Sequence, residues 1–357
     1  MLIWFIGSLL LIFIAYVGYP IFCFVRARLF AQPILRGKDQ PKVSVLIAAY
    51  REAGTIARKL ESLSRQTYPQ TLIEIIVACD GSDDGTDEVA ARTAGVCVVK
   101  IPSRRGKPNA LNEAARAASG QILILTDARQ PLSENAIEVL VADLGDPKVG
   151  AVGGELVMGG DAPAGAYWKY EALIRKMEGR AGSTVGVSGA LYAIRRELFV
   201  PLPEETILDD VLAPMRVRLG GLRVGFEPEA KAFDVAAQSA REFQRKVRTL
   251  SGNFQLLAIE PRLLSPFHNP SWLDFVCHKL LRLVVPYALL IALLSPLAFA
   301  PILTGLQLVG YGLAALRGIG QLKGVKLAGL AETFVVLNAA AVVGLFRFLR
   351  YGRKLPW

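Results

Sequence analysis

The sequence predicts an α/β domain with a mostly parallel sheet, held between apolar helices near both ends of the chain. Four short apolar runs rich in β-branched residues alternate with helix-like stretches between residues 42 and 130. Uncharged apolar segments long enough to cross a bilayer lie before and after this region. Alternating strands and helices are typical of a doubly wound sheet, in which ligands bind at the carboxyl ends of the strands.

The first apolar segment, residues 2–25, contains no charge and has no small-residue cleavage site. These features favour an uncleaved membrane anchor over a signal peptide. Arg26 and Arg28 follow it, so the positive-inside rule places the next segment in the cytoplasm. The net charge of +10 favours anionic lipids and phosphorylated substrates as partners, with no nucleic acid. Four scattered cysteines without a C-x-x-C pair fit a reduced cytosolic domain.

Two later apolar runs bring the expected number of spans to three or four. Residues 283–316 are long enough for two short spans, and residues 327–346 are interrupted once, at Glu332. If the last run spans, the basic residues after it face outward, against the positive-inside rule. A re-entrant or interfacial position is therefore the alternative to a span. The expected division is an anchor at 1–28, a cytoplasmic domain at 42–257, an interfacial amphipathic segment at 258–282, and transmembrane or re-entrant helices at 283–349.

The elements of the central region follow in order. Expected strands cover 43–49, 73–79, 96–101 and 122–127, and expected helices cover 54–66, 85–94 and 109–118. In the second half, 149–158 and 189–194 are expected strands. Residues 167–180 form an amphipathic helix and residues 240–257 a basic helix leading toward the membrane.

Carboxylates stand at three of the four expected strand ends: Glu52, Asp80 and Asp127. Turns and helix caps favour the same residue types, yet a nucleotide explains the repetition better, because carboxylates accept hydrogen bonds from base and ribose. A basic loop with Arg104, Arg105 and Lys107 precedes a helix and suits a diphosphate, although a solvated turn has the same composition.

The segments "VSVLIAAYREAGTI", "IIVACDGSDDGT", "GKPNALN" and "LTDAR" together resemble the family 2 inverting glycosyltransferases, which have the GT-A fold, a Rossmann-like arrangement. "VSGALYAIRRELF" and "ILDDVLAPMRVRLGGLRVGFEPEA" resemble the family's acceptor floor and catalytic-base segments. The resemblance spans residues 42–257. The flanking apolar segments are similar to those of the membrane branch that includes cellulose, hyaluronan and chitin-type synthases.

The resemblance implies roles for individual residues. Asp210 is the implied general base, and Asp127 the implied ligand of Mg²⁺ or Mn²⁺, beside the ribose and diphosphate. The other implied substrate-binding residues are Ala49, Tyr50, Glu52, Asp80, Lys107, Arg129, Gly189, Asp209, Arg245 and Arg248. Helix N-capping is the alternative for Asp209 and Asp210, because a helix starts there.

Two departures from the family pattern stand out. The second carboxylate of the D-x-D motif is replaced by Arg129, which either swings away from the metal or itself faces the diphosphate. In the Q-x-x-R-W motif of processive synthases, Arg245 replaces the glutamine, Arg248 matches the arginine, and Thr249 replaces the tryptophan.

The expected function is transfer from a UDP-sugar to a growing polysaccharide, as in exopolysaccharide or capsule synthesis, at the cytoplasmic face of a bacterial inner membrane. The alternative enzyme transfers one sugar to a lipid or lipid-linked acceptor. Three or four spans make a narrow conduit for one chain, which favours this alternative or a homo-oligomer. A hypothesis of another class is a non-catalytic sugar-nucleotide-binding subunit.

Overall fold

Seven strands form one mixed sheet in the order β3-β2-β1-β4-β6-β5-β7. The computed structural model describes residues 1–159, 164–235, 239–322 and 324–355. The strands are β1 (Val43–Ala49), β2 (Ile73–Asp80), β3 (Val96–Ile101), β4 (Ile122–Asp127), β5 (Val149–Gly159), β6 (Leu191–Arg195) and β7 (Arg223–Val235). β1 to β4 pair in parallel, β6 is antiparallel to β4 and β5, and β5 pairs with β7 in parallel. The predicted α/β fold with a mostly parallel sheet is confirmed.

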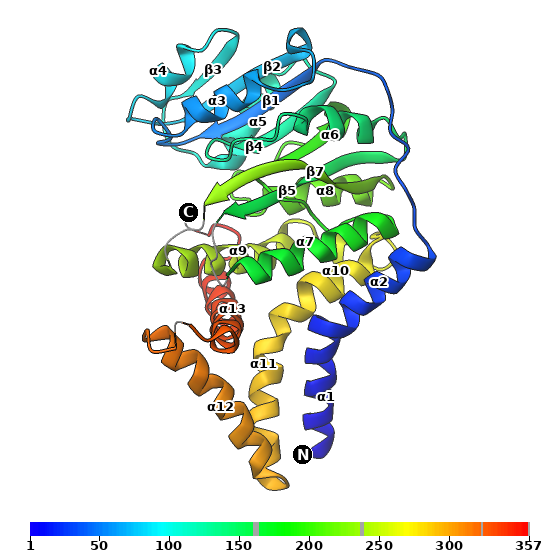
Figure 1. Cartoon of the computed structure of the whole chain (residues 1–357), viewed down its shortest axis with the longest axis vertical. Helices are drawn as coiled ribbons and strands as arrows, with labels where there is room; N and C mark the ends of the chain where they lie inside the picture. Colours follow the sequence, from blue (N-terminus) through cyan, green and yellow to red (C-terminus); the bar gives the residue numbers. More distant parts are fainter. Residues whose placement is uncertain (160–163, 236–238, 323, 356–357) are drawn as a thin grey trace.

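Helices cover both faces of this sheet (Figure 1). They are α3 (Ile56–Ser64), α4 (Thr86–Ala91), α5 (Lys107–Ala117), α6 (Ala136–Leu144), α7 (Ala164–Ala181), α8 (Asp209–Leu219) and α9 (Ser239–Ile259). Successive side chains of a strand point to opposite faces, so β1 contributes to two cores. Leu46 packs with α5 and α8 residues, whereas Val45 and Ile47 pack with α3 and α6 residues. Burial on both faces explains why these strands are continuously apolar.

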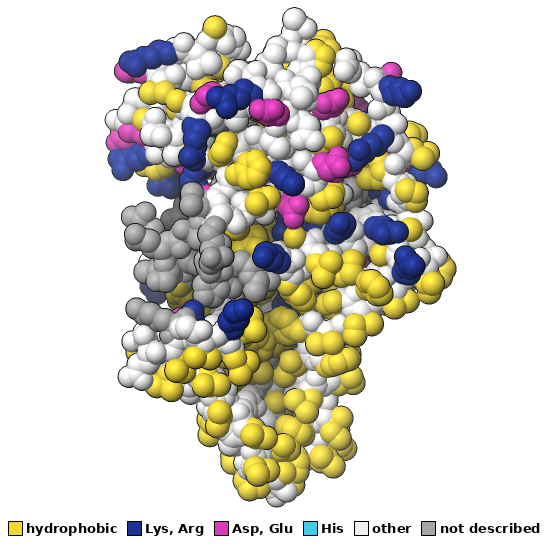
Figure 2. Space-filling model, viewed as in Figure 1, with side chains coloured by type: hydrophobic (Ala, Val, Ile, Leu, Met, Phe, Trp, Pro, Cys, Tyr) yellow, Lys and Arg dark blue, Asp and Glu magenta, His cyan; other side chains and the backbone are white. Residues whose placement is uncertain are grey.

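Long apolar helices extend from one side of the α/β domain (Figure 1). α1 (Leu2–Phe13) continues through a π-helical turn into α2 (Tyr19–Leu29). α10 (Trp272–Phe275) likewise continues through a π-helical turn into α11 (Leu281–Leu294), followed by α12 (Pro301–Gly318) and α13 (Lys326–Tyr351). By length and composition, three helices of the described chain could span a membrane: Leu2–Leu29, Trp272–Ala298 and Lys326–Tyr351. Figure 2 shows that hydrophobic side chains dominate the surface of this half.

The second of these helices begins at Trp272, eleven residues before the apolar run that starts at Leu283. Its first turns carry charged side chains that contact α7. His278 Nδ1 lies 2.6 Å from Glu178 Oε1 of α7, and Arg282 pairs with Glu171 of the same helix. The uncharged run begins only after these residues, whereas the helix begins before them, because α7 supplies partners for their charges.

The last apolar run forms one continuous helix, α13, which packs against α9 and α12. The side chain of Glu332, the one charge expected to interrupt the run, is held by Arg317 of α12 at 3.2 Å.

The segment between α2 and β1 lies along the side of the domain and is pinned by hydrogen bonds. The backbone N–H of Gln32 donates to the Arg180 carbonyl at 2.8 Å, and that of Leu35 donates to the Asp146 carboxylate at 3.1 Å. This segment therefore fixes the sheet relative to the first apolar helix.

Candidate active site

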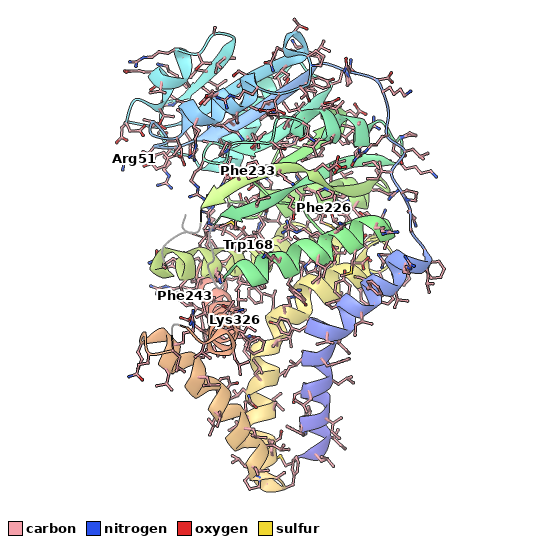
Figure 3. All side chains as sticks on the ribbon, viewed as in Figure 1. Arg51, Trp168, Phe226, Phe233, Phe243 and Lys326 are labelled. Atoms are coloured by element: carbon pink, nitrogen blue, oxygen red, sulfur yellow. The ribbon has the colours of Figure 1, made fainter. Side chains whose placement is uncertain are left out.

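A cavity of about 150 Å³ lies at the carboxyl ends of β1 and β2, where the fold class predicts a ligand. It is lined by Ala48, Ala49, Tyr50, Asp80, Arg104, Gly106, Lys107, Ala110 and Arg248. Residues from two strand ends, the basic loop, α5 and α9 therefore meet in one place. Five substrate-binding residues expected from the sequence are among them. Figure 3 shows Arg51, which follows β1, at this edge of the sheet.

Asp80 organises the basic loop. Its two carboxylate oxygens accept hydrogen bonds from the backbone N–H groups of Arg105 at 2.8 Å and Gly106 at 2.7 Å. Gly81 has a φ of +66°, and a Cβ there would lie 2.5 Å from the Arg104 nitrogen. Glycine is therefore required at the turn after β2, because the loop lies directly on it.

Cationic side chains line the cavity. The Arg104 guanidinium lies 4.1 Å from the centroid of the Tyr50 ring, within cation–π range. Burial lowers the pKa of Arg248, and the nearby Asp209 opposes that shift. Together with Lys107, these groups form an environment that attracts an anion.

Lys107, at the start of α5, lies between two carboxylates. Its Nζ is 2.9 Å from Asp127 Oδ1 at the end of β4 and 3.2 Å from Asp209 Oδ2 at the start of α8. Burial favours the neutral amine, but Asp127, Asp209 and then Asp210 outweigh it and hold the pKa of Lys107 well above its usual range. Lys107 is therefore a permanent cation that joins three elements of the site.

Asp210 is held by the backbone at the segment expected to form the acceptor floor. The N–H of Gly189 donates to Asp210 Oδ2 at 3.0 Å. A Cβ at Gly189 would lie 3.2 Å from Lys107 Nζ and 3.3 Å from Asp210 Oδ2, so a larger residue would crowd both groups. Burial and the neighbouring Asp209 raise the pKa of Asp210, while Lys107 and Lys279 lower it; the net shift is upward. A carboxylate with a raised pKa is a better proton acceptor.

Arg129, at the third position of the D-x-D-like segment, forms an ion pair with a carboxylate of β7. Its Nη2 donates to Asp234 Oδ2 of β7 at 2.8 Å, and Gln130 Nε2 donates to the same oxygen at 2.8 Å. Asp127 remains as the carboxylate that faces the site.

Other expected residues lie outside the cavity lining. The Glu52 carboxylate accepts a hydrogen bond from Thr55 at the start of α3. Arg245 is exposed on α9, one turn before Arg248, and its carbonyl accepts the Thr249 hydroxyl at 3.0 Å. Of the two basic residues of the synthase-like motif, only Arg248 reaches the cavity.

Sequence reasoning missed Lys279. This residue lies on the π-helical turn of the second apolar helix, yet it is close enough to Asp210 to lower the pKa of that carboxyl. A basic residue close to an apolar run is itself a signal for a functional role, because a charge within a membrane segment is costly. Its neighbours His278 and Arg282 carry the same signal, which was present but not used.

Part of this chain is similar to a known protein family. Residues 44–200 match the family described as Glycosyl transferase family 2. The chain carries a family 2 glycosyltransferase domain. The matched range contains β1 to β6 and the strand ends that form the cavity.

Two curated relatives of this chain are poly-beta-1,6-N-acetyl-D-glucosamine synthases. That of Staphylococcus epidermidis is 24% identical over 258 residues, which cover 68% of this chain and 62% of the relative. That of Staphylococcus aureus is 24% identical over 268 residues, covering 71% and 63%. The matched region thus amounts to less than two thirds of each relative.

A solved structure matches this chain over nearly its whole length. It is the mannosyltransferase PcManGT from Pyrobaculum calidifontis, in complex with GDP-Man and Mn²⁺. The TM-score is 0.78 at 25% identity, and the match covers 97% of this chain and 99% of PcManGT. The likeness therefore includes the apolar helices as well as the GT-A-like domain.

Proposed function

We propose that this glycosyltransferase transfers a sugar, with inversion, from a nucleoside diphosphate sugar to an acceptor hydroxyl. The single observation that carries the proposal is the contact of Lys107 with Asp127 and Asp209, next to Asp210 and the basic cavity. This arrangement offers a proton acceptor and a cationic diphosphate site within one pocket.

In the proposed reaction, the Asp210 carboxylate takes the proton of the acceptor hydroxyl. The hydroxyl oxygen attacks the anomeric carbon of the donor sugar from the face opposite the leaving group. The bond between that carbon and the diphosphate oxygen breaks, and the nucleoside diphosphate leaves with the bond's electron pair. Lys107, Arg104 and Arg248 stabilise the negative charge on the leaving diphosphate.

Asp127 is the proposed protein ligand of Mg²⁺ or Mn²⁺. Among the described residues, no group of three or more His, Cys, Asp or Glu side chains is arranged to hold a metal ion. A cation here would therefore take further oxygen ligands from the donor diphosphate, which suits Mg²⁺ and Mn²⁺. When bound, such a cation neutralises charge on the leaving group. PcManGT was solved with Mn²⁺, which supports the proposal.

The proposed acceptor is a growing polysaccharide, supported by the synthase relatives. A lipid or lipid-linked acceptor is the second candidate. One observation favours it: Thr249 stands where processive synthases have tryptophan. The α/β domain would face the cytoplasm, because Arg26 and Arg28 end the first apolar helix.

The test is nucleotide release by the purified full chain in lipid nanodiscs. UDP-sugars and GDP-mannose are offered one at a time with Mg²⁺, Mn²⁺ or EDTA, with membrane lipid extract as the acceptor source. We expect release from one donor, dependent on metal, and product length then separates polymer from single transfer. Tight nucleotide binding without release from any donor would support the non-catalytic subunit instead.

A further inference from the structure

A second and larger cavity lies apart from the donor site, between the apolar helices and the α/β domain. Its volume is about 440 Å³, and it shares no lining residue with the donor cavity. Its lining includes Phe22, Arg26, Phe30, Arg218, Arg223 and Asp274. The lining comes from the end of α2, the end of α7, the end of α8, the start of β7 and the start of α10. Neither the family match nor the donor chemistry accounts for it.

The charge of this cavity is positive. Three arginines line it against one carboxylate, Asp274. Arg26 uses both Nη atoms on Asp274, at 2.9 and 3.0 Å, so one positive charge is neutralised. The positive charges of Arg218 and Arg223 have no further carboxylate on the lining to neutralise them. Burial lowers the pKa of Arg218, and the nearby Arg223 and Arg26 add to that shift, whereas Asp274 opposes it. The cavity therefore holds guanidinium groups that repel one another.

Arg218 is placed to bind a ligand. Its Nε donates to Ser271 Oγ at 2.8 Å, and within the described part of the chain neither of its Nη atoms has a hydrogen-bond partner. Arg223 is held more firmly, because its Nε donates to the Gly182 carbonyl and its Nη2 to the Gln32 carbonyl, both at 2.6 Å. A fixed guanidinium beside one with free Nη donors suits a phosphate, which accepts bidentate hydrogen bonds.

The position of the cavity indicates where that phosphate comes from. Arg26 lies in the last turn of the first apolar helix, and Asp274 lies in the first turn of the second. Phe22 and Phe30 on the lining are 41% and 67% exposed, so apolar surface adjoins the arginines. Figure 2 shows Lys and Arg side chains next to the level at which the hydrophobic surface begins. Phospholipid headgroups lie at this boundary if the apolar helices span a membrane.

We propose that this cavity binds the phosphate headgroup of an anionic phospholipid. Arg218 and Arg223 hold the phosphate, and Phe22 and Phe30 contact the upper part of the acyl chains. The lipid bridges both apolar helices and the ends of α7 and α8, so it stabilises the α/β domain on the membrane. This role is independent of sugar transfer.

The test is lipid binding by the purified full chain in detergent, measured by native mass spectrometry and by thermal unfolding. The probes are phosphatidylglycerol, phosphatidylcholine and free sn-glycerol 1-phosphate. We expect phosphatidylglycerol to bind at least tenfold more tightly than the other two and to raise the unfolding temperature. Arg218→Gln is expected to lose this preference. Arg28→Gln removes the same charge two residues from Arg26, on an exposed side chain outside the cavity, and is expected to bind like the wild type.

Several results would overturn the proposal. Equal affinity of the wild type and Arg218→Gln for phosphatidylglycerol would show that Arg218 does not bind the lipid. Equal affinity of the wild type for phosphatidylglycerol and phosphatidylcholine would show that the cavity does not prefer an anionic headgroup. Glycerol phosphate binding as tightly as phosphatidylglycerol would assign the cavity to a soluble phosphate. Arg218→Lys serves if Arg218→Gln does not fold: it keeps the charge but not the planar fork, so we expect the preference to persist with several-fold weaker binding. Unchanged affinity in Arg218→Lys would contradict bidentate binding.

Discussion

Arg129 donates a hydrogen bond from Nη2 to Asp234 Oδ2 at 2.8 Å, which directs its guanidinium to β7. The pair joins the loop after β4 to a strand from the second half of the domain. The Asp234 side chain is 2% exposed and that of Arg129 is 46% exposed, so the buried carboxylate benefits more from the pair.

Arg129→Gln is expected to lower the free energy of unfolding and to leave the nucleotide-sugar KM within about threefold. The loss is about 1 kcal/mol, because Gln130 still donates to Asp234 and Arg129 is half exposed. Chemical unfolding and steady-state kinetics measure the two effects. Arg92→Gln, an exposed arginine after α4, is the control. A large rise in KM with unchanged stability would mean that Arg129 faces the diphosphate.

Lys107→Met is expected to lower kcat by about 10²–10³, the usual cost of removing one fixed group that stabilises transition-state charge. The variant also leaves Asp127 and Asp209 without the cation between them. Initial rates at saturating donor measure the effect. Lys42→Met, at the opposite end of β1, is the matched control and is expected to keep wild-type kcat. Full activity of Lys107→Met would show that Lys107 does not stabilise the transition state.

The pH dependence of kcat/KM tests the electrostatics of Asp210. The base must be deprotonated, so activity falls as pH drops through the pKa of Asp210, which burial and Asp209 raise. Lys107 lowers that pKa, so Lys107→Gln is expected to move the acid limb to higher pH. Because Asp209 and Asp210 interact, the apparent pKa read from the acid limb belongs to the two carboxyl groups together. An acid limb that stays in place, or moves to lower pH, would contradict this account.

Gly189→Ala is expected to reduce kcat more than donor affinity. The added methyl group would lie 3.2 Å from Lys107 Nζ and 3.3 Å from Asp210 Oδ2, so both must shift. Kinetics and nucleotide binding by calorimetry separate the two effects. Gly312→Ala on α12 has open space at the new Cβ and controls for the substitution itself. Equal losses in both measurements would indicate general disruption.

The buried amine of Lys59 is expected to make the free energy of unfolding depend on pH. It is fully buried on α3, donates to Thr126 Oγ1 at 2.6 Å and to the Gln130 carbonyl at 2.7 Å, and burial lowers its pKa to about 7. Between pH 7 and 10 the unfolded chain binds the proton that the folded chain releases, so stability from this group rises with pH. Lys59→Met removes the titrating amine, so the free energy of unfolding of the variant, relative to that of the wild type, is expected to fall from pH 7 to pH 10. Chemical unfolding at both pH values measures this, and an equal difference at both would contradict it.

Much of this arrangement follows from local patterns in the sequence. β-Branched runs predict β1 to β4, and because parallel strands end at one edge, they also predict that Asp80 and Lys107 meet. The sequence could not predict the partner of Arg129. Asp234 lies more than a hundred residues away and meets Arg129 only because β7 is brought back beside the end of β4 by long-range packing.

The start of the second apolar helix shows the same limit. Hydropathy places its apolar run at Leu283, but the helix begins at Trp272 because Glu171 and Glu178 of α7 partner the charges of its first turns. The phosphate-binding cavity was also absent from the sequence interpretation, since its arginines come from three separate elements. Patterns within a segment therefore predict strands and strand ends, whereas contacts between distant segments require the fold.

The central claim is that Asp210 is the base of a family 2 sugar transfer, and Asp210→Asn tests it most directly. Asparagine keeps the shape of the side chain and can still accept the hydrogen bond from Gly189, but it cannot take a proton. In parallel, kcat and the affinity for the nucleotide sugar are measured, with Asp39→Asn on the exposed linker as the control. We predict a loss of about 10²–10⁴ in kcat with donor affinity unchanged. Retained turnover in Asp210→Asn would contradict the account.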